Sequence, residues 1–261
     1  MLTLNNCLYK ILENLIKSDT KYTTGRPLTY EIKHYINVIF KVLSTGCQWN
    51  SLTEKLHYTV YHKHFIKWCN QGIFKNLNEI VSIMVSKFKK INKDAYIDTT
   101  IIRNIGGIED ISHNYKIKSK KGTKVSIIVN SLGMPLSIHV VNSNYHDVSL
   151  VLPTYYKINK NIKIENLIGD KGYVSEKIKK YLNEKHNVNY YYSDKTNSKK
   201  NNNMNNKIKN KIKARMINEN SFSWMTQYRR LTCRYDKYTK TFESFIIFAF
   251  SNITLNKINK F

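Results

Sequence analysis

The chain has 261 residues and a formal net charge of +25, because 43 lysines and arginines outnumber 18 aspartates and glutamates. This charge predicts a polyanionic partner, and a hydrophobic content of 41% excludes a disordered basic tail. The longest apolar run, residues 245–250, is too short to cross a bilayer, so we expect no membrane protein. Four widely spaced cysteines and the lack of a secretion signal predict an intracellular protein without disulfides.

Residues 1–90 are predicted to form a helical, DNA-binding type of N-terminal domain. Apolar residues at helical spacing run from Ile32 to Leu43, and Gly46 is well placed to end that helix. The Ser-x-x-Glu pattern of residues 51–54 is typical of a helix N-terminus and predicts a short helix that reaches about His57.

A third helix is predicted to follow. Its apolar stripe consists of Tyr61, Phe65 and Trp68. Lys63 and Lys67 point outward from it, where they could contact DNA. Three short helices with tight links resemble a helix-turn-helix module. A helical bundle that only packs against the rest of the chain explains the same stripes equally well, so both interpretations stay open.

From residue 91 onward the hydrophobic period changes to that of strands, and residues 91–261 are predicted to form an α/β domain. Strands are expected at residues 95–101, 124–130, 136–141, 162–168 and 188–192, and helices at 148–156, 174–184, 214–235 and 242–258, the last of them amphipathic. The stretch 194–213 is rich in Asn and Lys and is predicted to be a basic insertion. This order of elements indicates an RNase H-like domain with a mixed sheet.

Three isolated carboxylates are the candidate catalytic residues. Asp98 interrupts the apolar strand YIDTT, where a charge is costly unless it is paired or bound to a metal ion. Asp170 directly follows the strand that ends in LIG, and ligands bind at the carboxyl ends of strands in open α/β sheets. Glu219 lies on the predicted helix 214–235 and is expected to lie against the two aspartates. Each has an ordinary structural explanation when taken singly, but together they predict a shared metal site.

The chemistry of three carboxylates in a basic chain favours divalent cations. Mg²⁺ binds through a few carboxylates, waters and substrate phosphates, and Mn²⁺ could substitute for it. Two such ions can hold both the attacking and the leaving oxygen of a phosphodiester displacement. The sequence therefore predicts phosphoryl transfer on a nucleic acid.

Four arginines fall on the predicted helix 214–235, namely Arg215, Arg229, Arg230 and Arg234. A guanidinium group holds phosphate in a fixed fork, whereas an ammonium group acts as a point charge. That helix is therefore predicted to contact DNA. Lys171 directly follows the second aspartate and is a further candidate for a phosphate contact, although an ordinary surface lysine explains it as well.

Several segments carry a resemblance to a known family. They are TGRPLTYEIKHYINVIFKVLSTGCQWNSL, YIDTT, KSKKGTKVSIIVNSLGMPLSIHVVNSNYHD, LIGDKGY and RMINENSFSWMTQYRRLTCRYDKY, and they cover about residues 24–250. In this order they resemble the DDE-type transposases of bacterial insertion sequences, specifically the insertion-sequence-five group. The resemblance implies an RNase H-like catalytic domain.

The resemblance also implies roles for individual residues. Asp98, Asp170 and Glu219 would form the metal-binding triad, and Arg215 would be the arginine that precedes the glutamate in the family pattern. His146 and Asp147 match the family's His-Asp pair, for which we expect a supporting role near the site. The implied partners are double-stranded DNA, in the form of terminal inverted repeats and target DNA, and a second copy of the chain in a homodimer.

The activity implied is DNA transposition: metal-dependent hydrolysis at the element ends, followed by transfer of the freed 3′-hydroxyl into target DNA. Two alternatives stay open. A catalytically inactive, captured transposase would bind DNA without cutting it. A nuclease without strand joining would cut DNA but leave the ends unjoined.

Overall fold

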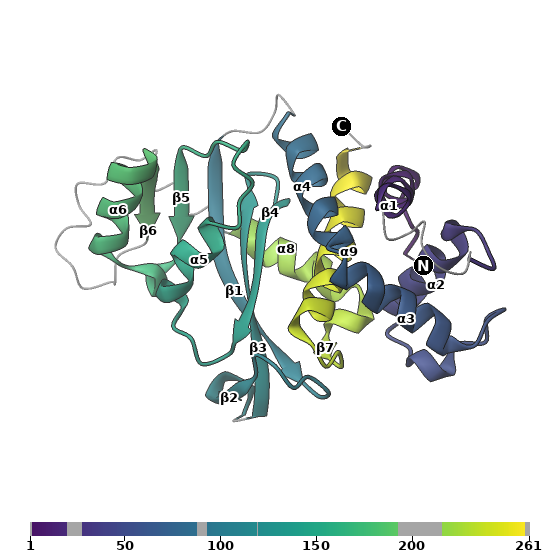
Figure 1. Cartoon of the computed structure of the whole chain (residues 1–261). Helices are drawn as coiled ribbons and strands as arrows, with labels where there is room; N and C mark the ends of the chain where they lie inside the picture. The colour runs from purple at the N-terminus through teal and green to yellow at the C-terminus, as the bar shows by residue number, and fades with distance from the viewer. Residues whose placement is uncertain (1, 20–27, 88–92, 119, 193–215, 259–261) are drawn as a thin grey trace. The chain divides into compact units, whose positions relative to one another are not determined.

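The computed structural model describes residues 2–19, 28–87, 93–118, 120–192 and 216–258. Contacts divide the chain into two compact units, which are described separately and whose elements are labelled in Figure 1. The first unit comprises Met1–Val81, Ile102–Glu109 and Trp224–Phe261, and the second comprises Ser82–Ile101 and Asp110–Ser223. These units differ from the predicted domains 1–90 and 91–261, because the last part of the chain folds with the N-terminal helices.

Helices dominate the first unit. They are α1 (Asn6–Ser18), α2 (Ile32–Thr45), α3 (Tyr58–Asn70), most of α4 (Ile73–Ser86) and α9 (Thr239–Ile258). The predicted end of α2 is confirmed, since Gly46 is left-handed at φ 70° and its N–H donates to the Val42 carbonyl. The apolar stripe of α3 is also confirmed: Phe65 lies in the core, stacked on Phe245 of α9 at 4.2 Å between ring centroids.

The short helix predicted for residues 51–57 is wrong. Only a 3₁₀ turn, η2 (Trp49–Ser51), forms there. A capping box requires the glutamate to return to the first residue, but the Glu54 carboxylate instead pairs with Lys41 at 2.7 Å. The chain is held in a different path, in which the Leu56 N–H donates to the Tyr61 hydroxyl.

The last helix, α9, is not amphipathic as predicted. Thirteen of its residues, from Thr241 to Leu255, are buried, and they lie on all sides of the helix. A helix that is apolar all round is stable only inside a core, where each face has a partner. In the first unit it packs against α1 and α3, and its Asn252 side chain donates to the Tyr228 hydroxyl at 2.9 Å.

The described strands form one mixed sheet, as predicted, but with seven strands where the sequence predicted five. Its order is β2 (Ser112–Asn114), β3 (Lys120–Asn130), β1 (Asp94–Asn104), β5 (Asn166–Gly169) and β6 (Asn189–Tyr192). The strand β4 (Pro135–Asn142) is antiparallel to β3, and β5 is parallel to both β1 and β6. The short strand β7 (Cys233–Arg234) pairs with the end of β1 that belongs to the first unit.

Helices of the second unit pack against this sheet. They are η3 (Tyr115–Ile117), η4 (Asp147–Leu150), α5 (Val151–Tyr155), η5 (Lys171–Tyr173), α6 (Glu176–His186) and the first part of α8 (Met216–Thr226). Ala95, Ile97 and Leu167 of the strands meet Val151 and Leu182 of the helices in the core of this unit. The predicted insertion 194–213 lies outside the described residues.

The prediction that one helix spans residues 214–235 is wrong for the second half of that range. The described helix α8 ends at Thr226, and the 3₁₀ turn η7 (Arg229–Leu231) and β7 follow it. Helical spacing of apolar residues continues through this segment, but Cys233 and Arg234 pair with β1 instead. Tertiary pairing therefore overrides the local helical pattern. Among the helices described here, none is long and apolar enough to span a membrane.

Candidate active site

The register of two parallel strands brings Asp98 and Asp170 together. In the β1–β5 pair, residues 94, 95 and 96 lie opposite residues 166, 167 and 168, an offset of 72. The paired residues end at 96 and 168, and the same offset continued by two residues would set Asp98 of β1 level with Asp170, the residue after β5 (98 + 72 = 170). Neighbouring strands lie about 4.8 Å apart, and side chains alternate between faces with a period of two. The two carboxylates therefore emerge from adjacent strands, on the same face and at the same level.

A hydrogen bond further down the same strands supports this alignment. Asp94 and Asn166, four residues before the two site aspartates, are opposite each other, and the Asn166 amide donates to the Asp94 carboxylate at 2.6 Å. Both side chains are buried. Because residues 94 and 98 share a face, as do 166 and 170, the polar face extends from this pair to Asp98 in β1 and to Asp170 directly after β5.

Local backbone geometry orients each of these two carboxylates. The Asp98 carboxylate accepts a hydrogen bond from the Thr99 N–H at 2.7 Å. The Asp170 carboxylate accepts one from the Gly172 N–H at 2.7 Å and so caps η5. Both side chains are half-buried, so their oxygens are held by the backbone and still reach solvent.

A third carboxylate lies beside them. A methyl group built on Gly172 would come within 3.0 Å of an Asp170 oxygen and within 3.8 Å of an Asp147 oxygen. The first distance is tighter than an ordinary contact and the second is an ordinary van der Waals distance, so the backbone of η5 at Gly172 lies against both carboxylates. Asp147 was expected to support the site, and the structure brings it to the same place as Asp170.

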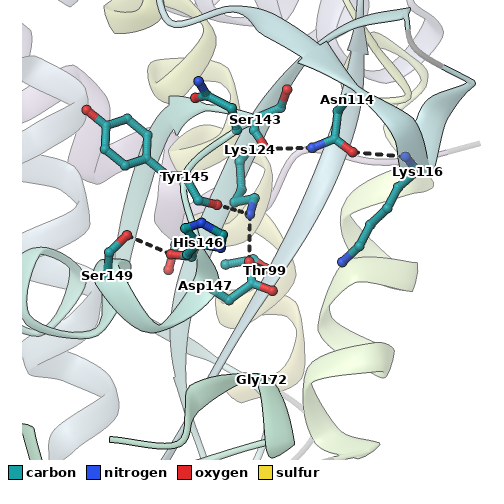
Figure 2. Close-up of polar contacts among 12 residues, drawn as sticks. Thr99, Asn114, Lys116, Lys124, Ser143, Tyr145, His146, Asp147, Ser149 and Gly172 are labelled. Carbon is teal, nitrogen blue, oxygen red and sulfur yellow. Dashed lines mark hydrogen bonds and ion pairs between the residues drawn. The ribbon is translucent and has the colours of Figure 1, made fainter.

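Asp147 is held by a buried lysine. Figure 2 shows the Lys124 ammonium between two oxygen acceptors: the Asp147 carboxylate at 2.6 Å and the Tyr145 carbonyl at 2.5 Å. The Thr99 hydroxyl also donates to Asp147, at 2.8 Å. Because Thr99 follows Asp98 on β1, this contact connects the first candidate aspartate with the third carboxylate through one residue.

These contacts keep the Asp147 carboxyl group ionised. Burial alone would raise the pKa of this carboxyl, but the hydrogen bonds from Lys124 and Thr99 and the charge of Lys124 lower it below its ordinary value. Asp147 is therefore an ionised group at neutral pH. One of its oxygens is engaged by Lys124, whose side chain is only 5% exposed.

Tyr173 shows independently that the three carboxylates gather in one place. Its hydroxyl is buried and has no well-formed hydrogen bond among the described residues, although Thr99 lies near enough to lower its pKa. Burial raises that pKa well above 10, and the negative charges of Asp98, Asp147 and Asp170 raise it further. One phenol thus lies in the field of all three carboxylates and stays neutral beneath them.

Glu219 is not placed with this group. It lies in the first turn of α8 and is exposed. The opposite face of the helix is fixed by the Ser221 hydroxyl, which donates to the Gly133 carbonyl at 2.9 Å, and by the buried Asn218. Within the described ranges, no group of three His, Cys, Asp or Glu residues could hold a metal ion. The structure therefore joins Asp98 and Asp170, and does not bring the predicted third ligand to them.

Carboxylate oxygens are nevertheless the ligands that fit a hard divalent cation such as Mg²⁺. Asp98 presents such oxygens from within β1 and Asp170 from the residue after β5, and both are partly open to solvent. Asp147 is less available, because Lys124 already holds one of its oxygens. Asp98 and Asp170 are thus the residues of the described chain that best fit a metal ion.

Two members of this network were missed by sequence reasoning, namely Lys124 and Tyr173. A signal for Lys124 exists: it opens the run KVSIIV on β3, where every residue from 124 to 130 is buried. A lysine in such a run requires an acceptor. Nothing in the sequence alone identifies Asp147 as that acceptor, since the two residues are 23 positions apart.

The predicted DNA-contacting residues lie in different environments. Lys171 is exposed beside Asp170 in the second unit. In the first unit Lys63 and Lys67 are exposed on α3, and Arg229 is exposed in η7. Arg215 lies outside the described residues. His146 is exposed, and its backbone carbonyl accepts from Ser149.

The prediction for Arg230 needs correction. Its guanidinium group donates to both oxygens of Asp236, at 3.2 and 3.0 Å, and both side chains are only 6% exposed. Arg234 is fully buried and donates to the Asp236 carbonyl at 3.1 Å. Forked pairs of this kind hold a turn in place. Neither arginine lies on α8, and their buried donors stabilise the first unit, so Arg230 is not available to phosphate.

Two families of known sequences match the chain. The sequence model of a family described as "Transposase DDE domain" matches residues 93–253, about three fifths of the chain. A second, described as "Putative transposase of IS4/5 family", matches residues 4–78. No curated protein matches the chain.

Proposed function

Because the chain belongs to the transposases with a DDE domain, we propose that it cuts DNA at the ends of a mobile element and joins the freed ends to target DNA. The observation that supports this chemistry best is the parallel register of β1 and β5, which, continued by two residues, sets Asp98 within β1 level with Asp170, the residue after β5. A net charge of +25 supports DNA as the substrate, because a polyanion is attracted to such a chain.

The proposed reaction consists of two displacements on phosphorus. In the first, a water oxygen forms a bond to the phosphorus at the element end, and the 3′-oxygen leaves and takes a proton. In the second, that 3′-hydroxyl oxygen attacks a target phosphorus, loses its proton and displaces a target 3′-oxygen. Each step forms one P–O bond and breaks one, so positioning and charge are what the protein must supply.

Asp98 and Asp170 are the proposed catalytic residues that would hold divalent metal, Mg²⁺ in the first instance and Mn²⁺ as a substitute. Metal bound there would activate the attacking oxygen and neutralise charge on the leaving oxygen. Glu219 is the proposed third ligand; it is exposed on α8 and has no contact that binds it elsewhere among the described residues. Asp147 is proposed as a positioning residue, since it connects Lys124 with Thr99 beside Asp98.

Contacts with DNA are proposed for Lys171, which is exposed next to Asp170, and for Lys63, Lys67 and Arg229, which are exposed in the first unit. Arg215 is retained from the family pattern alone. A homodimer is also proposed, because joining two element ends in one reaction requires two active sites that act together. The helix-turn-helix interpretation of residues 1–90 would place Lys63 and Lys67 on a helix that contacts the element ends.

The proposal is tested by cleavage of a labelled duplex that carries the end of the element encoding this chain, with Mg²⁺ or Mn²⁺. Asp170→Asn keeps the shape of the side chain and removes its charge, and it should lower the cleavage rate by a factor on the order of 1,000 or more. Glu165→Gln is the matched control, since Glu165 precedes β5 and its side chain is 59% exposed. Equal cleavage by wild type and Asp170→Asn would refute the assignment.

The exposed position of Glu219 favours a second candidate, a captured transposase that binds DNA without cutting it. It predicts binding that weakens steeply with salt and no metal-dependent cleavage by the wild type. A nuclease without joining is the third candidate, and it is recognised by cleaved ends that never appear in a target molecule. The same labelled duplex, incubated with a supercoiled target plasmid, separates all three.

A further inference from the structure

The hairpin of β2, η3 and the start of β3 is strongly basic. Residues 111–124 contain five lysines and no aspartate or glutamate. The fifth of these, Lys124, is buried against Asp147. The other four are exposed and are called the basic hairpin: Lys116, Lys118, Lys120 and Lys121.

Hydrogen bonds fix this hairpin to the segment that carries the site. The Asn114 amide donates to the Ser143 carbonyl at 2.6 Å (Figure 2), and the Ser112 and Ser143 hydroxyls are 2.8 Å apart. The Asn144 N–H also donates to the Ser112 hydroxyl, at 2.9 Å. The next residues along the chain are Tyr145, whose carbonyl binds Lys124, and Asp147. The basic hairpin is therefore held in a defined position beside the carboxylates.

The positive charge of the basic hairpin lowers the pKa of a carboxyl group at the site. After burial, which raises the pKa of Asp147, and the contacts with Lys124 and Thr99, which lower it, the charge of Lys116 lowers it further. Three carboxylates repel the phosphates of an approaching DNA strand. A group of exposed ammonium ions next to them supplies the opposite charge where such a strand must pass.

Backbone geometry does not explain why lysine stands in this turn. Lys118 is left-handed, with φ 55° and ψ 47°, and its N–H donates to the Tyr115 carbonyl at 3.0 Å. Glycine and asparagine adopt this conformation more readily than lysine does. Tyr115, at the start of the same turn, is 79% exposed. Exposed lysines beside an exposed aromatic ring are typical of surfaces that bind nucleic acid.

We propose that the basic hairpin binds the phosphate backbone of duplex DNA and holds it next to Asp98 and Asp170, an inference that rests on the proposed function. It adds a DNA contact in the second unit that is separate from Lys171. The carboxylates and the basic hairpin would then form one DNA-binding surface, in which the lysines attract the DNA phosphates that the carboxylates repel.

The test is the salt dependence of DNA binding by the full chain. The double variant Lys116→Gln, Lys118→Asn removes two charges, and asparagine suits the left-handed turn, so the hairpin should keep its fold. The probe is the labelled duplex with the element end. If both lysines contact phosphate, the slope of log K against log salt should become shallower by roughly 1.8, and the dissociation constant should rise up to roughly 60-fold at about 0.1 M salt.

The matched control removes the same charge from the opposite edge of the sheet. Lys177 and Lys185 are exposed on α6, which packs against the edge strand β6, whereas the basic hairpin lies at the β2 edge. The variant Lys177→Gln, Lys185→Gln should change the slope by much less than the hairpin variant. A hairpin variant with the slope of this control would overturn the inference.

Cleavage by the wild type keeps the two proposals apart. If the wild type cuts the duplex and the hairpin variant binds it like the control variant, only the hairpin inference fails. If the wild type neither binds nor cuts the duplex, the proposed function fails and the inference fails with it. Circular dichroism melting of each variant confirms that the loss of affinity does not reflect unfolding.

Discussion

Lys124 carries its charge in a position almost closed to solvent, with 5% of its side chain exposed, whereas its partner Asp147 is 24% exposed. A buried pair adds little stability by itself, because desolvation offsets much of the attraction. Removal of one partner is costly when the other cannot return to water. Because Lys124 is the more buried partner, the loss of Asp147 should destabilise the second unit more than the loss of Lys124.

Asp147→Asn should destabilise the protein more than Lys124→Met. The first change removes the negative charge that neutralises a buried ammonium group and leaves it with neutral acceptors alone, the Tyr145 carbonyl and the new amide oxygen, so it should cost about 3 kcal/mol. The second leaves a carboxylate that still receives the Thr99 hydroxyl and partial solvent, and should cost about 1–2 kcal/mol. Denaturant unfolding measures both free energies. The reverse order would show that Lys124 gains enough solvent or other acceptors without Asp147.

His139 should make stability depend on pH. Burial, and then the charge of Lys157, lower the pKa of this residue from 6.5 to about 4, against an opposing effect of Asp110. The unfolded chain therefore takes up a proton near pH 6.5, and the folded chain only near pH 4. The free energy of unfolding should therefore fall by at most about 3 kcal/mol as the pH drops from 6.5 to 4. Below pH 4, His139 should cause no further change.

The variant His139→Gln isolates that effect. Its unfolding free energy should decline less than that of the wild type between pH 6.5 and pH 4. Thermal or urea unfolding at several pH values measures the difference. Parallel pH profiles for the two proteins would show that His139 is protonated equally well in the folded and unfolded chains.

At the scale of elements, end residues and tertiary partners determine where each helix begins and ends more than apolar spacing does. Gly46 ends α2 where the sequence predicted, because its left-handed conformation suits glycine. The Ser-x-x-Glu pattern failed because Lys41 engages Glu54, and α8 stopped at Thr226 because the following residues join the sheet. In both failures a partner far along the chain competes with a local pattern.

Gly46→Ala should cost more than Gly72→Ala. Both glycines are left-handed, at φ 70° and 79°, so alanine costs about 1–2 kcal/mol at each from the backbone alone. At Gly46 a methyl group would also lie 3.0 Å from the Arg229 Cβ, whereas at Gly72 it would meet nothing within 4 Å. Denaturant unfolding of the two variants isolates the steric contribution. Equal losses would mean that η7 moves aside at no cost.

At the scale of the whole molecule, DNA binding and DNA cleavage should respond differently to the removal of metal. A net charge of +25 should attract DNA whether or not metal is present, whereas the proposed cleavage would require metal at the carboxylate site. Removal of divalent metal with a chelator should therefore abolish cleavage of the labelled duplex and leave binding nearly unchanged. Cleavage rates and binding isotherms at one ionic strength measure the two effects. Undiminished cleavage under chelation would contradict a metal-dependent reaction.

The sequence by itself determined the class of the fold and predicted two aspartates of the candidate site. Strand-like periods and the isolated aspartates lie within short stretches, so neighbouring residues were enough to identify them. It also marked Asp147 as a supporting residue through the family resemblance. The mixed sheet agrees with the predicted RNase H-like fold, and β1, which carries Asp98, pairs with β5, which ends directly before Asp170.

Only the tertiary structure decided what surrounds those residues. The register of β1 and β5 aligns the two aspartates, Lys124 reaches Asp147 across 23 positions, and Arg230 turns inward to Asp236. No local pattern encodes such pairings, because the energy of a buried charge depends on which distant group can neutralise it. The chain's motifs therefore predict its chemistry, while the packing within each unit decides which charged side chains are buried and which stay at the surface.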